Sequence, residues 1–238
     1  EYTDFDNTDL IEKLIKGMSI EEKVGQVIQG DLDFISPADV RKYKIGSVLN
    51  GGNTAPNKDK YSSAEDWKTL SKEFYEASPS YQGVKVPILW GTDAVHGHNN
   101  VIGATLFPHN IGLGATRNEA LVRNIGEAIA LEVLSTGVAW TFAPTIAVPQ
   151  DDRWGRTYEG FSEDPILVSK LGKALVLGLQ GQGDTFLDNN HVIATAKHFM
   201  GDGGTFEGID QGNTRISDCL LYTSDAADDS LRVDLGGR

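Results

Sequence analysis

Charged and imidazole side chains gather in three short segments of this sequence, each directly after a run of apolar residues. Asp93 lies in the first segment, Arg156 ends the second, and Lys197-His198 opens the third. Carboxylate, guanidinium, ammonium and imidazole groups together offer hydrogen-bond donors and acceptors in many directions. This mixture suits a neutral polyol, whose hydroxyls both donate and accept, better than it suits an anion.

Aromatic residues accompany these segments. Trp90, Trp154 and Phe199 could place a ring face on the C–H surface of a sugar. A fourth and weaker polar segment, Asn50-Gly-Gly-Asn53, follows an earlier apolar run. The residue types therefore favour a carbohydrate site.

Two of the polar segments also allow other interpretations. His96 and His98 could hold a metal ion, but one His-X-His pair without further ligands is a weak signal, and hydrogen bonds that brace the loop are the simpler reading. Asp151 and Asp152 could act as a pair of carboxylates, although a salt bridge to Arg153 is an equally simple interpretation.

Helical and strand patterns alternate along the chain and must position these segments. Short apolar runs predict strands at 45–49, 86–90, 139–146 and 191–196. Apolar residues at three- and four-residue spacing predict helices, whose starts are marked by Thr8, by the capping boxes Ser19–Glu22 and Thr116–Glu119, by Ala64 and by Asp164-Pro165. The apolar faces of all these helices are expected to be core.

This alternation predicts an α/β fold with a parallel sheet and crossover helices. The loops after the last three predicted strands are long and carry the polar segments, whereas the loops on the opposite side are shorter. That asymmetry favours a barrel, whose sites form at the carboxyl ends of its strands. An open doubly wound sheet is the alternative.

Composition excludes several classes of partner. The chain has 238 residues and a formal net charge of −13, with no basic stripe, so no nucleic acid is expected. No apolar run approaches the roughly 20 residues of a membrane span, and the first residues lack the features of a signal peptide. The single cysteine excludes an internal disulfide framework. We predict no cofactor and no metal.

The segment from Cys219 to Arg238 follows none of these patterns, since it has neither a helical apolar face nor sustained alternation. It resembles the translation of a transposase adapter used in sequencing libraries. We therefore expect residues 1–218 to be the native part and residues 219–238 to be a non-native tail.

Five segments, in this order, resemble the N-terminal domain of glycoside hydrolase family 3: Met18–Gln26, Gly91–Asn100, Phe107–Thr116, Pro149–Arg156 and Lys197–Gly204. The branch they resemble most is that of β-glucosidases and exo-acting β-glucan glucohydrolases. The resemblance implies a barrel followed by an α/β sandwich domain. Residues 1–218 are then expected to form the first half of a (β/α)8 TIM-like barrel, with the sandwich domain missing.

The resemblance also implies a reaction, the retaining hydrolysis of terminal, non-reducing β-D-glucosyl residues of a β-glucoside or β-glucan oligosaccharide. It assigns Asp93 to the hydroxyls of the glucose, with Arg156, Lys197 and His198 around the same ring. Its nucleophile Asp and acid/base Glu match no position here. Because retaining chemistry needs both carboxylates, no residue is assigned as catalytic and the chain by itself is expected to be inactive. A periplasmic or secreted location is typical of such proteins.

The specificity is open to alternatives, namely a β-xylosidase or β-N-acetylhexosaminidase of the same fold, or a non-catalytic sugar-binding chain. The hexosaminidase branch typically carries Lys-His-Phe-Pro-Gly-His-Gly. Met200 and Asp202 stand here in place of that Pro and second His. This departure argues against the hexosaminidase.

Overall fold

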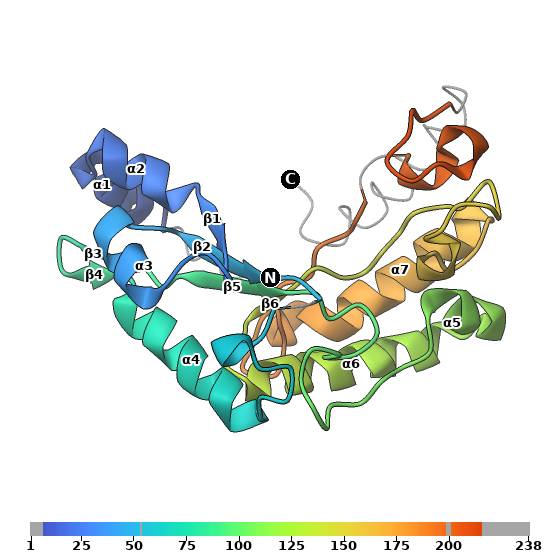
Figure 1. The fold of residues 1–238 in the computed structure, drawn as a ribbon, viewed down its shortest axis with the longest axis horizontal. Coiled ribbons are helices and arrows are strands. Elements are labelled where there is room, and N and C mark those ends of the chain that lie inside the picture. Colours follow the sequence, from blue (N-terminus) through green and yellow to red (C-terminus); the bar gives the residue numbers. More distant parts are fainter. Residues whose placement is uncertain (1–6, 53, 199–200, 216–238) are drawn as a thin grey trace. The chain divides into compact units, whose positions relative to one another are not determined.

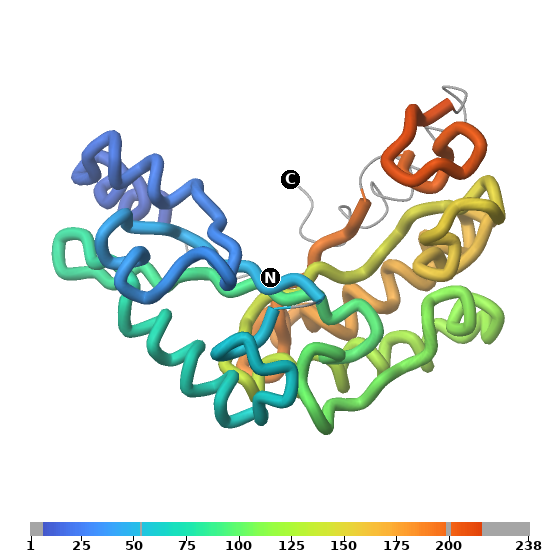
Figure 2. The backbone as a smooth tube through the Cα atoms, in the orientation of Figure 1, coloured from blue at the N-terminus to red at the C-terminus, as the bar shows by residue number. Residues whose placement is uncertain are grey.

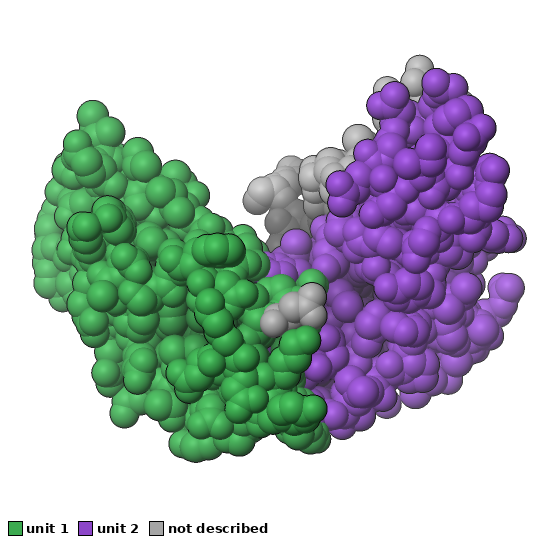
Figure 3. Space-filling model, viewed as in Figure 1, with its two compact units in different colours: residues 1–93, 100–103, 135–140 green, residues 94–99, 104–134, 141–238 purple. Residues whose placement is uncertain are grey.

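The computed structural model describes residues 7–52, 54–198 and 201–215. The chain divides into two compact units (Figure 3). Unit 1 comprises residues 1–93, 100–103 and 135–140, and unit 2 comprises residues 94–99, 104–134 and 141–238. The predicted tail at 219–238 and the predicted stacking residue Phe199 lie outside the described residues, as do Asn53 and Met200.

Parallel strands form the centre of unit 1. Strands β1 (Gln29–Asp31), β2 (Ser47–Asn50) and β5 (Leu89–Thr92) pair in parallel, with Val48 of β2 opposite both Gly30 and Trp90. The sheet order is β1-β2-β5-β6, where β6 (Trp140–Thr141) lies at the point along the chain where unit 1 passes into unit 2. Strand β1 was not predicted, because its residues Gln-Gly-Asp form no apolar run.

Helices connect these strands, as a parallel sheet requires. Helix α3 (Pro37–Tyr43) joins β1 to β2, and α4 (Ala64–Ala77) joins β2 to β5, and the two helices pack against each other (Figure 1). Helix α4 has the predicted bounds, and it buries Trp67 and Phe74 of the predicted face. The predicted α/β class with a parallel sheet is confirmed.

The two N-terminal helices of unit 1 depart from expectation, at one cap and at the apolar faces of both helices, which are largely exposed. Helix α1 (Thr8–Gly17) has Asn7, not Thr8, at its cap position, and it buries none of its residues, so its apolar face is not core within the described chain. Helix α2 (Ile20–Gln26) begins with the predicted capping box, in which the Ser19 hydroxyl accepts from the Glu22 N–H. The short elements of the unit are the turn η1 (Pro56–Lys58) and the antiparallel pair β3 (Ser80–Tyr81) and β4 (Val84–Lys85).

Three α-helices give unit 2 its framework, and their path can be followed in Figure 2: α5 (Asn110–Thr116), α6 (Glu119–Ser135) and α7 (Pro165–Gln180). Asp164 caps α7 as predicted, since its carboxylate accepts from the Ile166 N–H, and Gly181 ends the helix with a φ of +72°. The predicted capping box at Thr116 is wrong. Asn118 Oδ1 accepts from the Leu121 N–H instead, at 3.0 Å.

Segments 141–146 and 193–197 of unit 2 run parallel without forming the two full strands that the sequence predicted. Thr141 N–H donates to Ile193 O at 2.8 Å, and Lys197 N–H donates to Pro144 O at 2.9 Å. Pro144 has no N–H to continue the ladder, and Val192 N–H donates to Leu179 O of α7 instead.

Four 3₁₀ turns complete the described part of the unit: η2 (Thr157–Glu159), η3 (Gly183–Thr185), η4 (Asp202–Gly204) and η5 (Phe206–Gly208). No described helix is both long enough and apolar enough to cross a membrane.

Candidate functional site

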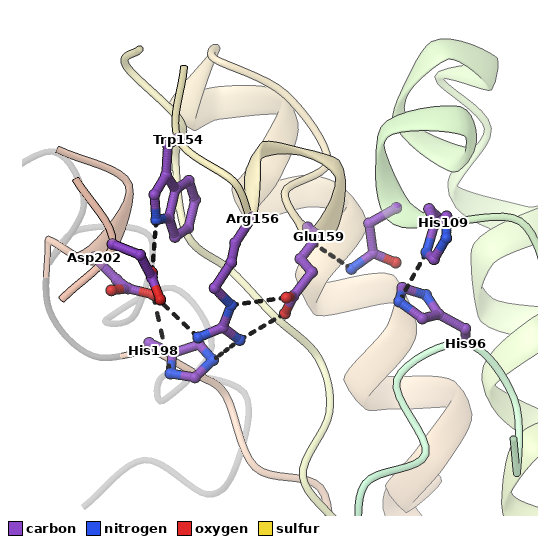
Figure 4. A network of polar contacts seen from close by, with 9 residues as sticks. His96, His109, Trp154, Arg156, Glu159, His198 and Asp202 are labelled. Atoms are coloured by element: carbon purple, nitrogen blue, oxygen red, sulfur yellow. Dashed lines mark hydrogen bonds and ion pairs between the residues drawn. The ribbon is translucent and has the colours of Figure 1, made fainter. Parts of the chain in front are cut away.

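Arg156 and Glu159 form the centre of a polar network in unit 2 (Figure 4). Arg156 immediately precedes η2, and this single turn brings Glu159 back beside it. The guanidinium donates from Nε to Glu159 Oε1 and from Nη2 to Oε2, each over 2.7 Å. The two side chains are 27% and 11% exposed. Two-point pairing of this kind fixes the guanidinium in position and orientation.

Glu159 keeps its negative charge although it is buried. Burial raises the pKa of this carboxyl, but the hydrogen bonds and charge of Arg156, assisted by the charge of Lys197, lower it by more, and the net pKa lies below its ordinary value. The hydrogen bond to Glu159 in turn raises the pKa of Arg156. The pair is therefore ionised at neutral pH.

His198 receives a hydrogen bond from the same guanidinium. Arg156 Nη2 and His198 Nε2 lie 2.7 Å apart. A guanidinium can only donate, so Nε2 accepts and the proton of the neutral ring must be on Nδ1. Burial first, and then the positive charge of Arg156, lowers the pKa of His198.

Asp202, the first residue of η4, faces both of these groups. Its Oδ2 lies 4.0 Å from Arg156 Nη1 and 4.0 Å from His198 Nδ1. The oxygen is buried and accepts no hydrogen bond within the described residues. The network thus connects a carboxylate, a guanidinium, an imidazole and a second carboxylate, in the order Glu159, Arg156, His198 and Asp202.

Two further hydrogen bonds flank this network. Asn110 Nδ2 donates to the Glu159 carbonyl at 2.8 Å, and Trp154 Nε1 donates to Asp210 Oδ1 at 2.9 Å. Glu159 was not among the predicted site residues, and its i, i+3 spacing from Arg156 is the signal that could have indicated the pair.

His96 and His109 form a second polar pair in unit 2. His96 Nε2 and His109 Nδ1 are 2.8 Å apart, so one ring donates a hydrogen bond to the other. The Tyr158 ring lies edge-on to His109, with centroids 4.6 Å apart.

His98 is separate from this pair. Burial lowers its pKa to about 4, partly opposed by the charge of Glu132. Within the described ranges no three His, Cys, Asp or Glu side chains gather as metal ligands would.

Three of the four predicted sugar-binding residues, Arg156, Lys197 and His198, belong to unit 2. Lys197 is part of the network through its charge, which acts on both Glu159 and His198. Asp93 directly follows β5 and belongs to unit 1, where it is partly buried. Its grouping with the other three residues stays a prediction.

Two predicted stacking residues are core residues instead. Trp90 is 4% exposed, packs edge-on against Phe74, and donates from Nε1 to Asn50 Oδ1 at 2.7 Å. Trp154 is 2% exposed. The prediction that these rings stack on a sugar is therefore wrong, because a buried ring offers no face to a ligand.

Two other predicted polar segments are explained by local bonds. Asn50 is fully buried and its Nδ2 donates to Thr92 Oγ1 at 2.9 Å, so it ties β2 to β5. Asp151 pairs with Arg153, with 2.6 Å between Oδ2 and Nη2, and the hydrogen bonds from Arg153 lower the pKa of Asp151 to about 2. The salt-bridge interpretation of Asp151 is confirmed.

Known proteins resemble this chain over most of its length. It is 49% identical to the exo-1,3/1,4-β-glucanase ExoP of a Pseudoalteromonas species, with a TM-score of 0.91 over 98% of this chain and 29% of that one. It is 33% identical over 233 residues to a lysosomal beta glucosidase of Dictyostelium discoideum and 30% identical over 214 residues to a periplasmic beta-glucosidase of Salmonella typhimurium. The latter two matches cover 89% and 88% of this chain.

The chain spans only about a quarter of the length of those two relatives, 28% and 25% respectively. The model of the glycosyl hydrolase family 3 N terminal domain matches residues 19–225. This match, and the shared fold, confirm the predicted partial (β/α)8 TIM-like barrel. The chain therefore belongs to glycosyl hydrolase family 3, within its N-terminal domain.

Proposed function

We propose that the whole protein to which this chain belongs hydrolyses terminal, non-reducing β-D-glucosyl residues by a retaining mechanism. This chain would supply side chains that hold the sugar. The observation that carries the proposal is the network of Arg156, Glu159 and His198 in a chain that is 49% identical to an exo-1,3/1,4-β-glucanase. The substrate class is a β-glucoside or a β-glucan oligosaccharide.

The proposed roles follow from hydrogen-bonding capacity. Arg156 Nη1, which lies 4.0 Å from Asp202 Oδ2, can donate to a sugar hydroxyl. The Lys197 ammonium is a second donor, and the Asp93 carboxylate is an acceptor that can take two adjacent hydroxyls. His198 completes the set. Donors and acceptors of both kinds match a ring of neighbouring hydroxyls.

We expect these 238 residues alone to bind glucose weakly and to hydrolyse nothing, since no residue is assigned as nucleophile or acid/base. Titration calorimetry with glucose should give binding that Arg156→Ala abolishes. Asp151→Asn, which weakens the ion pair with Arg153 in the same loop, should leave the binding of glucose unchanged. Absence of binding by the unsubstituted chain would contradict the sugar-holding role.

Release of nitrophenol from an aryl β-glucoside tests the second half of this expectation. No turnover above the uncatalysed rate is expected from the chain. Turnover that survives repurification and disappears in Asp93→Ala would show that the chain contains its own catalytic groups.

A β-xylosidase is the second candidate, because a β-xylosidase of Formosa agariphila is 34% identical to this chain over 154 residues. Xylose lacks the hydroxymethyl group of glucose, so the two activities differ by the contacts to that group. Kinetics of the whole protein with aryl glucoside, xyloside and N-acetylglucosaminide decide between them. We expect the highest kcat/KM with the glucoside. A higher value with the xyloside would favour the second candidate.

The proposed location is periplasmic or secreted. Its support is the resemblance to the periplasmic and lysosomal enzymes. Nucleic acid and membrane surfaces are not proposed as partners, because the net charge of −13 repels polyanions and anionic lipid alike.

A further inference from the structure

The imidazole of His198 has its protonation pattern dictated by its neighbours. Each Nη2 hydrogen of Arg156 has its own acceptor, one at Glu159 Oε2 and the other at His198 Nε2, both over 2.7 Å. An imidazole nitrogen that accepts a hydrogen bond carries no proton. The neutral ring then carries its single proton on Nδ1, the atom that faces Asp202 Oδ2.

Glu159 determines whether that hydrogen bond can form. An arginine side chain has many rotamers, and ordering one of them has an entropic cost. The two-point pairing with Glu159 fixes the guanidinium plane, and the Glu159 backbone is itself fixed by the hydrogen bond from Asn110 to its carbonyl. Without the carboxylate, the ion pair that the described contacts leave to the guanidinium is the longer one from Nη1 to Asp202 Oδ2, at 4.0 Å, which holds the direction of Nη2 less firmly.

Charged groups from several segments face the imidazole. Arg156, from the loop before η2, and Lys197, its chain neighbour, oppose a positive charge on the ring. Asp202 of η4 and Glu159 of η2 favour one. Burial is the largest influence and also opposes the charge, so the ring stays neutral to a lower pH than an exposed histidine does.

We propose that Glu159 is a positioning residue of the sugar site, which acts through Arg156 to hold His198 as the neutral tautomer protonated on Nδ1. This inference rests on the proposed function, because it concerns how the sugar-holding residues are kept in place. It directs the Nδ1–H of His198 toward the Asp202 carboxylate. A guanidinium that turned freely would leave either ring nitrogen able to carry the proton.

Long-range ¹H–¹⁵N correlation spectra of the histidine side chains measure the tautomer directly in the 238-residue chain at about pH 7.5. The variant His198→Gln identifies the signals of His198 by their loss. We expect an unprotonated Nε2 and a protonated Nδ1, in at least about tenfold excess, as a hydrogen bond from a charged donor provides. A protonated Nε2 in the unsubstituted chain overturns the inference.

Glu159→Gln is the matching variant, because it removes the charge and one acceptor while keeping the shape. We expect the excess of the Nδ1 tautomer to fall to about threefold or less, since a weaker hydrogen bond fixes the guanidinium less well. Glu159→Asp, which keeps a carboxylate, should restore part of the excess. Asp151→Asn is the control. It weakens the neighbouring ion pair between Asp151 and Arg153 and should leave the His198 signals unchanged. Unchanged signals in Glu159→Gln overturn the inference, and the measurement on the unsubstituted chain stands even if that variant fails to fold.

Glucose titrations of the same samples separate this inference from the proposed function. The unsubstituted chain should bind glucose, and Glu159→Gln should bind it about tenfold more weakly. If Glu159→Gln loses binding while its His198 tautomer stays as it was, the coupling through His198 is wrong and the sugar site stands. If the unsubstituted chain has the expected tautomer but binds no glucose, the sugar site is wrong and the coupling stands.

Discussion

Two histidines of unit 2 are held neutral by their surroundings, and each for its own reason. His98 is 1% exposed, and burial lowers its pKa to about 4 against the opposing charge of Glu132. His198 is only partly buried, and the charge of Arg156 reinforces the effect of burial. Both rings resist protonation in the folded state and take up a proton more readily in the unfolded state. The free energy of unfolding therefore depends on pH.

Acidification should therefore destabilise the protein through His98. Its folded pKa lies below the unfolded value of about 6.5, so the unfolded state binds the proton more readily as the pH falls, and stability present above about pH 6.5 is lost. At about 1.4 kcal/mol per pKa unit, this histidine should lower the free energy of unfolding by about 2 kcal/mol between about pH 7.5 and about pH 5. Urea unfolding at the two pH values measures the loss. His98→Gln should show a loss smaller by that amount, and an equal loss in the variant would contradict this origin.

Close helix packing shapes the elements that surround the site. Gly126 of α6 and Gly178 of α7 face each other, and a Cβ added at Gly178 would overlap the Arg123 carbonyl oxygen of α6. Gly114 of α5 is likewise in contact with the Phe161 carbonyl, in the segment that follows η2. Glycine at these points lets backbones approach closely, and α7 and η2 keep their places through these contacts.

The substitution Gly178→Ala should push α7 away from α6. Because the atoms that it meets are backbone and cannot move aside, we expect a loss of about 1 to 3 kcal/mol in the free energy of unfolding. Gly112→Ala is the control. It lies in α5, where the nearest neighbour of an added Cβ is Pro108 Cβ at 3.5 Å, an ordinary contact, so a gain of about 0.5 to 1 kcal/mol is expected. Chemical denaturation of both variants measures the difference, and a neutral Gly178→Ala would refute close packing at this position.

For the whole molecule, the net charge of −13 selects among ligands by their charge. A neutral sugar experiences no net attraction or repulsion from this field, whereas a phosphorylated or sulfated sugar is repelled at low salt. Local hydrogen bonds, and not long-range forces, should therefore determine the affinity for glucose.

Binding of glucose should accordingly be almost independent of ionic strength. Between about 0.05 M and about 0.5 M NaCl, screening should change its Kd by less than about twofold. Glucose 6-phosphate, if it binds at all, should bind more tightly as salt rises. Calorimetric titrations at both salt concentrations check this, and a strong salt dependence for glucose would mean that charge has a larger part in recognition than proposed.

Local signals in the sequence were sufficient for the elements with strong caps or strong periodicity. Helix α4 has the expected bounds, and the Asp164 cap and the Ser19 capping box formed as predicted. Elements without such signals were missed or misplaced. Strand β1 has polar residues and is a strand because β2 pairs with it, and Val192 bonds to α7 rather than to a strand partner.

At the site, residue type identified Arg156, Lys197 and His198 as polar groups after predicted strands, and the resemblance gave them roles. Residue type also placed Trp90 and Trp154 in that site, and they are buried in the core. Burial depends on what packs around a side chain, which neighbouring residues in the sequence do not reveal.

The sequence by itself determined the α/β class, the family and the kinds of side chain available for a sugar, because periodicity, caps and motifs are local properties of a chain. Only the tertiary structure decided which of those side chains lie close together. Glu159 fixes Arg156, Arg156 bonds to His198 forty-two positions further along the chain, and Asp202 faces both. The reason is physical, since hydrogen bonds require their atoms about 3 Å apart, and only the folding of distant segments brings them to that distance.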